Sequence, residues 1–515
     1  MYYKATNDYN DCISKGACSI SPKVAALQEV LFLIIRQITY FLVELRKLGV
    51  DSQNADIDLV TLITVVDLVK EFSENQLLEL YSNQYKKLVQ VRKEYLKVCN
   101  QINKDPKDVN NLLKLNTNIN LSIVLKRGEE EFIKKNKKLI NDKKFFAEIL
   151  RNVIKSVCNN LIDLADYSEF DTEISKKIFE AINIFNSSKI SVEKIKFYVD
   201  LLANSDLKLL NKINKCQYKH FGFTSKVQVS HSTRPNKAIM VAGSNLNDLK
   251  ILLETIKTTN IDVYTNGDLL VAHSFAKFGE YKNLRGHYGT GIFNTILDFA
   301  TFPGAILLSK NESKNIEYLY RGRLFTTDEI APSGVVKVDR NNFALLIESS
   351  LQAKGFAKGK NKEPEVVGFD RSVLLNEFQK ISETDYDEIY IIGPSNLSTH
   401  ELEHIKKYFE NNKENIFVLS FSYIPRVKNV ISINIGNNYP LLFDILKEFF
   451  NYVPLNSDKL NFLITKCDIN SLSGVIGLKN NGAKNIYMSD CPPLMINPTL
   501  LNAFMKFYDI KEMKE

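Results

Sequence analysis

The stretch VYTNGDLLVAH, residues 263–273, carries the pattern from which the fold of this chain can be worked out. It begins with a short β-branched and aromatic run, which is typical of a strand, and continues into a polar, glycine-containing turn. Similar strand-like runs lie on either side of it, AIMVAG at residues 238–243 and GAILL at residues 304–308. Helix-like segments separate these runs, and this alternation predicts a parallel sheet with helices on its faces.

A second block of the same kind follows the basic, glycine-containing stretch KGFAKGKNKEPE at residues 354–365, which we interpret as a linker. The strands expected in this block are residues 389–392, 416–420, 431–435, 462–464 and 485–488. Open parallel sheets bind ligands beyond the carboxyl ends of their strands. The loops that follow these strands are therefore where a site should be sought.

The chain before about residue 220 has apolar residues at helical spacing, as in residues 27–45. Ser21 followed by Pro22 predicts the start of this helix, and Gly49 predicts its end. Further helices are expected at residues 59–72, 77–98, 145–164 and 174–185. Helices of this length joined by short loops form bundles.

These patterns predict a multidomain α and α/β fold. An N-terminal helical bundle domain is expected at residues 1–222. It is followed by a first Rossmann-like α/β domain at residues 223–356 and a second one at residues 366–515. Both would be built on parallel sheets.

Composition places the chain among globular proteins. It has 515 residues, of which 44% are hydrophobic and 25% are charged. The net charge of +7 is mild for this length. The lysine-rich residues 134–144 could face an acidic partner or nucleic acid. They lack the interleaved aromatic residues of an RNA-binding surface, so we favour a solvated helix face and find no evidence for a nucleic-acid partner.

The sequence predicts a cytoplasmic protein with no membrane span. Its opening, MYYKATNDYNDC, lacks the basic and then apolar segments of a leader. The longest apolar stretch, residues 30–43, is interrupted by Arg36 and Gln37 and is shorter than the roughly 20 residues that a spanning helix needs. Seven cysteines without dense spacing indicate reduced thiols instead of a disulfide framework.

Four local sequences, taken in their order, resemble one enzyme family. They are VYTNGDLLVAH, LRGHYGTGI at residues 284–292, FATFPGAILLSKNES at residues 299–313 and YRGRLFTTD at residues 320–328. The segments CISKGACSISPKVAALQEVL, IYIIGPSN, NIGNN and NNGAKNIYM extend the likeness over nearly the whole chain. This set is similar to hybrid cluster proteins, also called prismane proteins or hydroxylamine reductases. The resemblance implies a helical domain, two Rossmann-like domains and an iron–sulfur–oxygen cluster held between them.

The resemblance also implies a simpler iron–sulfur cluster near the N-terminus, bound by a C-x-x-C pair and a C-x5-C pair of cysteines. Cys12 and Cys18 keep the second pair and its spacing. One position of the first pair falls at about Tyr3, and the other would precede Met1. Iron in a cubane needs thiolate ligands, so Cys12 and Cys18 are half of a cofactor-binding motif or two relic thiols.

The hybrid cluster of the family is held by one histidine, two glutamates and four cysteines. By resemblance, the histidine position falls on Ser244, the glutamates on Asp268 and Asp468, and the cysteines on Glu312 and near Pro394, Phe421 and Asn438. All four thiolates are thus replaced, and sulfur ligation is what selects iron–sulfur clusters over other metals. Cys467, next to Asp468, is a potential substitute ligand, although one thiol does not replace four.

Two classes of function follow. In the first, the chain is a pseudoenzyme without catalytic residues or a cofactor, which acts as a binding or structural protein and pairs with itself or with an active homologue. In the second, it is an oxidoreductase with substitute ligands around an iron–sulfur cluster, or it holds a hard divalent cation in the old cluster pocket. Oxygen ligands suit magnesium, manganese or calcium, and the positions that would supply them are Ser244, Asp268, Glu312, Asn438 and Asp468.

Plainer interpretations compete with these sites. The acidic residues could fill a wet cavity without binding anything. His273, His287 and Tyr288 lie in the retained string and are expected to form structural hydrogen bonds. Cys216 and His220 have a C-x3-H spacing, but no second ligand pair accompanies them, so a zinc site is not expected there.

Overall fold

The computed structural model describes residues 22–51, 53–66, 74–106, 121–136, 142–187, 189–289, 295–310, 318–328, 331–394, 403, 407, 415–421, 429–488 and 498–512. The chain divides into two compact units. The helical unit comprises Met1–Leu209, Asp468–Gly477 and Cys491–Tyr508. The sheet unit comprises Leu210–Cys467, Leu478–Asp490 and Asp509–Glu515.

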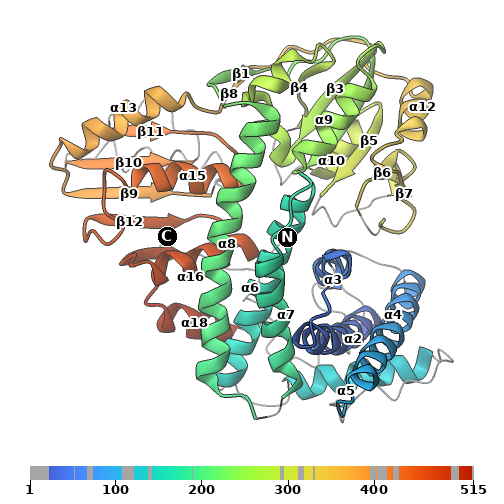
Figure 1. Ribbon diagram of the computed structural model, residues 1–515. Coiled ribbons are helices and arrows are strands. Elements are labelled where there is room, and N and C mark those ends of the chain that lie inside the picture. The colour runs from blue at the N-terminus through green and yellow to red at the C-terminus, as the bar shows by residue number, and fades with distance from the viewer. Residues whose placement is uncertain are drawn as a thin grey trace. The chain divides into compact units, whose positions relative to one another are not determined.

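The helical unit is a bundle. Its N-terminal helices are α2 (Pro22–Lys47), α3 (Gln53–Val66), α4 (Glu74–Gln101), α5 (Leu121–Asn136), α6 (Asp142–Ala165), α7 (Thr172–Asn183) with the 3-10 turn η2 (Ile184–Asn186), and the first part of α8 (Val192–Phe221). Most of α16 (Ile469–Asn480) and all of α18 (Pro498–Phe507) also belong to it. Helix α2 packs against α4, α5 and α7, and α6 packs against α3 and α18 (Figure 1).

Helix α2 begins at Pro22 and ends at Lys47, two residues before Gly49, whose φ of +82° is readily adopted by glycine. Ala26–Lys47 is long and apolar enough to cross a membrane by length and composition, and it extends beyond the apolar stretch 30–43 on which the prediction from sequence rested. However, 83% of its most apolar window is buried inside the protein, as in the core helix of a bundle. Among the described helices, α2 alone meets that criterion.

A glycine sets how closely α5 approaches α2. A Cβ at Gly128 would lie 2.0 Å from the backbone oxygen of Ala26. Only glycine leaves room for the two helix backbones at this point. The periodic apolar residues of α2 are therefore buried around a contact that a single methyl group would obstruct.

The first sheet of the sheet unit contains β2 (Lys237–Gly243), β3 (Ile261–Asn266), β4 (Leu284–His287), β5 (Ala305–Ser309), β6 (Leu324–Thr326) and β7 (Val336–Lys337). Its order is β4-β3-β2-β5-β6-β7, and every pair is parallel. Every residue of β3 and β5 is buried. Fully buried strands are typical of parallel sheets with both faces covered, here by α9 (Leu246–Thr255), α10 (Thr295–Thr301), α11 (Tyr318–Arg321) and α12 (Ala344–Gln352).

The second sheet contains β9 (Glu388–Ile392), β10 (Ile416–Ser420), β11 (Val430–Ser432), β12 (Leu460–Ile464), β13 (Asn485–Met488) and β14 (Lys511–Glu512). Its order is β11-β10-β9-β12-β13-β14, again parallel, and α13 (Arg371–Ser382) and α15 (Tyr439–Phe449) accompany it. In both sheets the first strand is central, the next two lie on one side and the last three on the other. This is the doubly wound Rossmann order, and the predicted fold class is confirmed (Figure 1).

A small two-stranded sheet connects these halves of the sheet unit. It pairs β1 (Val227–Val229) antiparallel with β8 (Glu365–Val367). The stretch interpreted as a linker is bound along its length, because Phe356 N donates to Asn236 O at 2.9 Å and Thr233 N donates to Lys360 O at 2.9 Å. The residue limits of the three predicted domains stay a prediction, since the two compact units divide the chain in another way.

Candidate functional site

The carboxyl ends of β2 and β5 meet at the point where the order of the first sheet reverses, which is where Rossmann folds bind ligands. Gly243 ends β2 with a φ of +140°, and a Cβ there would lie 1.9 Å from Ser309 O. Ser244 follows and is exposed. Its backbone N donates to Ser309 O at 3.1 Å, and its hydroxyl reaches Lys310 O at 3.4 Å. Contacts to the backbone of residues 309 and 310 therefore hold Ser244, which the resemblance places at the family's histidine ligand.

A buried aspartate organises the same edge of the sheet. The Asp248 carboxylate accepts hydrogen bonds from Ser309 Oγ and Thr327 Oγ1, both at 2.5 Å, and Arg340 Nε lies 2.7 Å from its second oxygen. Asn245 caps α9 by accepting from Asn247 N and Asp248 N at 2.9 and 3.1 Å. These contacts join the ends of β2, β5 and β6 into one polar network.

Lys310, directly after β5, adopts a left-handed φ of +49°. Its backbone N donates to Asp328 Oδ1 at 2.8 Å. Burial, assisted by the positive charge of Arg340, lowers the pKa of the Lys310 amine to about 7. An amine whose charged form is disfavoured by burial therefore lies at this edge of the sheet, with the carboxylates of Asp248 and Asp328 close to the two basic residues.

Two histidines of the retained string share one hydroxyl group. Thr265 Oγ1 lies 3.0 Å from His273 Nε2 and 2.9 Å from His287 Nδ1. Burial lowers the pKa of His273 to about 4 and that of His287 well below its usual value, and the nearby His231 contributes to both. Both rings are therefore neutral near pH 7 and act as hydrogen-bonding groups of the scaffold.

Asp268 lies in the 3-10 segment η3 (Gly267–Ser274) that follows β3. Its Oδ1 accepts a hydrogen bond from Asn437 Nδ2 at 2.8 Å. A Cβ at Gly436 would lie 3.8 Å from the Asp268 backbone oxygen, so the loop before α15 is in direct contact with this aspartate. Asn437 Oδ1 is buried and has no hydrogen-bond partner.

In the second sheet, two positions expected to supply sulfur carry apolar side chains. Pro394 is buried after β9, its peptide bond to Gly393 is cis, and its carbonyl accepts from Thr465 Oγ1. Phe421, directly after β10, is fully buried, and its N donates to Ile392 O at 2.8 Å. A Cβ at Gly393 would lie 2.9 Å from the Phe421 Cβ. Both residues are thus parts of the packed core at the end of the second sheet.

The remaining described positions have local structural bonds. Asn438 is the N-cap of α15, where its Oδ1 accepts from Leu441 N at 3.0 Å. Asp468 belongs to the helical unit, and its Oδ1 accepts from Ser471 N at 2.9 Å at the start of α16. Cys467 is buried and joined in a disulfide, so its sulfur is not a free thiolate.

Three predicted site residues, Cys12, Cys18 and Glu312, lie outside the described residues. Within the described part of the chain, no group of three or more histidine, cysteine, aspartate or glutamate side chains is placed to hold a metal ion. Of the predicted ligand positions in the sheet unit, the structure brings Asp268 to the loop that contains Asn438. Asn437, which makes that contact, was missed, although the asparagine-rich NIGNN was a visible signal.

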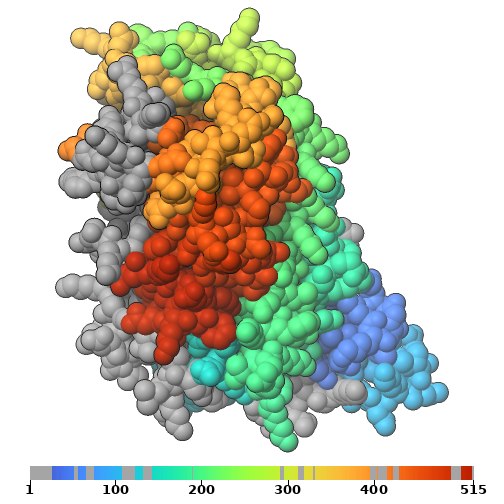
Figure 2. Space-filling view, turned by 90° about the vertical axis from the view of Figure 1, so that its left-hand side faces the viewer, coloured from blue at the N-terminus to red at the C-terminus, as the bar shows by residue number. Residues whose placement is uncertain are grey.

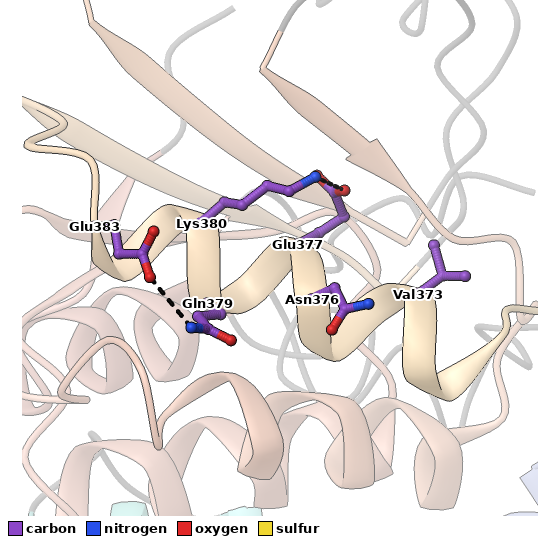
Figure 3. Close-up of a pocket in the computed structure, with 6 residues that line it drawn as sticks. All are labelled: Val373, Asn376, Glu377, Gln379, Lys380 and Glu383. Atoms are coloured by element: carbon purple, nitrogen blue, oxygen red, sulfur yellow. Dashed lines mark hydrogen bonds and ion pairs between the residues drawn. The ribbon is translucent and has the colours of Figure 1, made fainter.

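A surface hollow of about 400 Å³ lies along α13 and contains none of the predicted site residues. Its described lining residues come from α13 and from Glu383, the C-cap of that helix: Val373, Asn376, Glu377, Gln379, Lys380 and Glu383 (Figure 3). The polar ones bond along the helix, Lys380 to Glu377 at 2.6 Å and Gln379 to Glu383 at 3.2 Å. Gold-orange atoms of this part of the chain lie at the surface in Figure 2. Among its described lining residues, no group of three or more histidine, cysteine, aspartate or glutamate side chains is placed to hold a metal ion.

Comparison with known proteins gives related sequences over almost the full chain. The hydroxylamine reductase of Thermodesulfovibrio yellowstonii is 24% identical, and the match covers 98% of this chain and 96% of that protein. The hydroxylamine reductase of Zymomonas mobilis is 23% identical, with 98% and 95% covered. Among solved structures, the alpha subunit of an acetyl-CoA synthase/carbon monoxide dehydrogenase matches with a TM-score of 0.47 and 11% identity, over 96% of this chain and 81% of that one.

The model of one protein family, described as the Prismane/CO dehydrogenase family, matches residues 8–447. That range includes the retained string of motifs, the first sheet and the second sheet as far as α15. The chain therefore belongs to the Prismane/CO dehydrogenase family.

Proposed function

We propose that this chain is a non-catalytic relative of the hydroxylamine reductases, which keeps the two-sheet scaffold and acts as a binding or structural protein. The observation that supports this most directly is the burial of Pro394 and Phe421 at positions where the resemblance expects thiolates. Neither side chain has an atom that binds iron, and sulfur ligation is what holds such clusters. Hydroxylamine reduction by the family's cluster is not expected.

The test is metal and sulfide analysis of anaerobically purified protein, with an absorbance spectrum and a hydroxylamine-dependent assay of viologen oxidation on the same sample. The related enzyme of Zymomonas mobilis, purified in parallel, is the positive control. We expect a colourless protein without stoichiometric iron or acid-labile sulfide and with activity equal to the blank. Stoichiometric iron and sulfide, or turnover of hydroxylamine, would refute the proposal.

The alternative is an oxidoreductase with substitute ligands. If iron and sulfide are found, changing Cys12 and Cys18 to serine would show whether they hold them. Cys467 is a poor substitute ligand in the structure, because its sulfur is already in a disulfide.

A second candidate is a hard divalent cation near Asp268. It is supported by the Asn437 amide oxygen, which is buried without a hydrogen-bond partner in the side chain whose nitrogen bonds to Asp268. Oxygen ligands of this kind suit magnesium or manganese. Manganese titration followed by electron paramagnetic resonance would detect it, and Asp268→Ala should weaken binding. Asp458→Ala, in which an aspartate side chain that is 86% exposed is removed, is the control. No binding by the wild-type chain would dismiss the cation.

The binding partner proposed is a second copy of this chain or an active homologue. Support comes from apolar side chains of α10 and α11 that face solvent: Ile296, Leu297, Tyr318 and Leu319. Light scattering after size exclusion should detect a complex, and Leu319→Asp should weaken it more than Leu345→Asp on α12, which is also exposed. Monomers under all conditions would count against self-pairing.

The location proposed is the cytoplasm. Cys99, Cys158 and Cys216 are buried and form no disulfide, which agrees with a reducing compartment, whereas the disulfide of Cys467 indicates an oxidising one. Thiol labelling in intact cells, followed by mass spectrometry, would decide between them. A quantitatively oxidised Cys467 in cells would contradict this location.

A further inference from the structure

The loop NIGNN, residues 434–438, connects the second sheet to the first half of the sheet unit by two side-chain bonds. Asn437 Nδ2 donates to Asp268 Oδ1 at 2.8 Å. Asn434 Nδ2 donates to Glu365 Oε1 of β8, also at 2.8 Å. The backbone contributes as well, because Gly368 N donates to Asn434 O at 2.8 Å. The loop is therefore bound at η3 and at β8.

These contacts involve the two segments to which the resemblance assigns metal ligands of the family. The resemblance assigns one metal ligand to Asp268 and another to Asn438, which is the next residue after Asn437. Here the carboxylate bonds directly to the loop, and a Cβ at Gly436 would already lie 3.9 Å from Asp268 Oδ1. The Asn438 side chain is used as a helix cap. The residues present do not fit an iron–sulfur cluster between these two segments.

The chemistry of Asn437 fixes the direction of its bond. A carboxylate only accepts hydrogen bonds, so the amide must turn its NH₂ group towards Asp268. That orientation leaves Asn437 Oδ1 buried without a partner. An unsatisfied buried acceptor is unfavourable, and the charge-assisted bond on the other side of the amide offsets it.

We propose that the Asp268–Asn437 and Glu365–Asn434 hydrogen bonds form a latch that holds the 434–438 loop against the first half of the sheet unit, in place of metal ligation. The latch rests on the proposed function, since a bound cluster would compete for Asp268. Its Glu365 end is itself fixed, because Glu365 Oε2 lies 3.2 Å from His231 Nε2.

Hydrogen–deuterium exchange of the full-length protein, read by mass spectrometry, tests the latch at residues 262–275 and 430–442. Asn437→Asp removes the donor and sets two carboxylates against each other. We expect exchange of the loop to rise at least about tenfold, the factor that corresponds to one lost charge-assisted hydrogen bond. Asp268→Asn keeps a neutral bond and should change exchange less.

The double variant Asp268→Asn/Asn437→Asp exchanges the donor and the acceptor and should restore protection to within about threefold of the wild type. Asn451→Asp is the matched control, because Asn451 bonds to Glu448 at 3.4 Å on the exposed surface of the same half. Wild-type exchange in Asn437→Asp, or no rescue in the double variant, would overturn the latch. If Asn437→Asp does not fold, Asn437→Ala serves in its place, with the same tenfold expectation.

Iron and sulfide measured on the same preparations separate the two proposals. Iron in the wild type would refute the proposed function whatever the exchange shows. If the wild type lacks iron and its 434–438 loop exchanges hydrogen for deuterium as fast as the loop of Asn437→Asp, only the latch is refuted.

Discussion

The two sheets of the sheet unit have the same strand order but end in different chemistry. At the carboxyl ends of the first sheet, polar groups bond to one another around Asp248, Thr265 and Ser244. At the ends of the second sheet, Pro394 and Phe421 are part of the core. One sheet topology therefore supports either a polar or an apolar edge, so the order of strands does not determine what a site binds.

The largest effect is expected from one added methyl group at the carboxyl end of the central strand of each sheet, where Gly243 ends β2 and Gly393 directly follows β9. In Gly243→Ala the new Cβ would lie 1.9 Å from a backbone oxygen, whereas in Gly393→Ala it would lie 2.9 Å from the Phe421 side chain. The contact at Gly243 is the shorter of the two, so it requires the larger displacement of the neighbouring atoms. We expect a loss of about 3–5 kcal/mol in the free energy of unfolding for Gly243→Ala and about 1–3 kcal/mol for Gly393→Ala.

Urea titration of both variants, followed by circular dichroism, measures this difference. Equal losses would mean that the backbone contact at Ser309 relaxes as easily as the Phe421 ring does.

Acid should weaken the first sheet through its histidines. The folded-state pKa of His273 is lowered to about 4 from 6.5, so the unfolded chain binds the proton more readily. The stability is complete above about pH 6.5 and is lost as the pH falls towards 4. His273 alone contributes at most about 3 kcal/mol to the free energy of unfolding, because a shift of one pKa unit corresponds to about 1.36 kcal/mol and the ring is not fully enclosed. His287 acts in the same direction.

Urea midpoints measured from pH 7 to pH 5, above the range in which most carboxylates titrate, report this loss. His273→Gln should make the urea midpoint depend less steeply on pH. A midpoint that does not change over this range would show that the two rings are not held neutral.

The smallest expected effect compares the helix caps after the two sheets. Asn245 caps α9 with two bonds and is 6% exposed, whereas Asn438 caps α15 with one bond and is half-buried. Replacing either with alanine should reduce stability by about 0.5–2 kcal/mol, and more for Asn245. Thermal melts of the two variants test the order. A larger loss for Asn438→Ala would indicate that its loop contributes more than a cap.

Much of the fold could be predicted from local patterns. The core of α2 and its limits at Pro22 and Gly49 follow from apolar periodicity, a helix-starting proline and a glycine stop. The structure has strands at the predicted residues 238–243 and 416–420. Strands such as β6 and β7 were missed, because runs of two or three residues carry too little periodicity to be recognised.

The candidate site was predicted only as a set of positions. The resemblance located Ser244, Asp268 and Asn438, and the identities of the replacing residues indicated the loss of sulfur ligands. It did not show that Asp268 bonds to Asn437, because 169 residues separate them in sequence. Nor did it show that Thr265 is shared by two histidines, since that depends on β3 and β4 lying side by side.

The alternation of strands and helices and the family could be predicted from the sequence alone, because both depend on residue type and short-range spacing. Which polar groups form hydrogen bonds with one another at the ends of the sheets could be seen only in the tertiary structure. The physical reason is that a hydrogen bond requires two atoms within about 3 Å. The packing of the two halves of the sheet unit against each other, and not the local sequence, brings the loops after β3 and β11 to that distance.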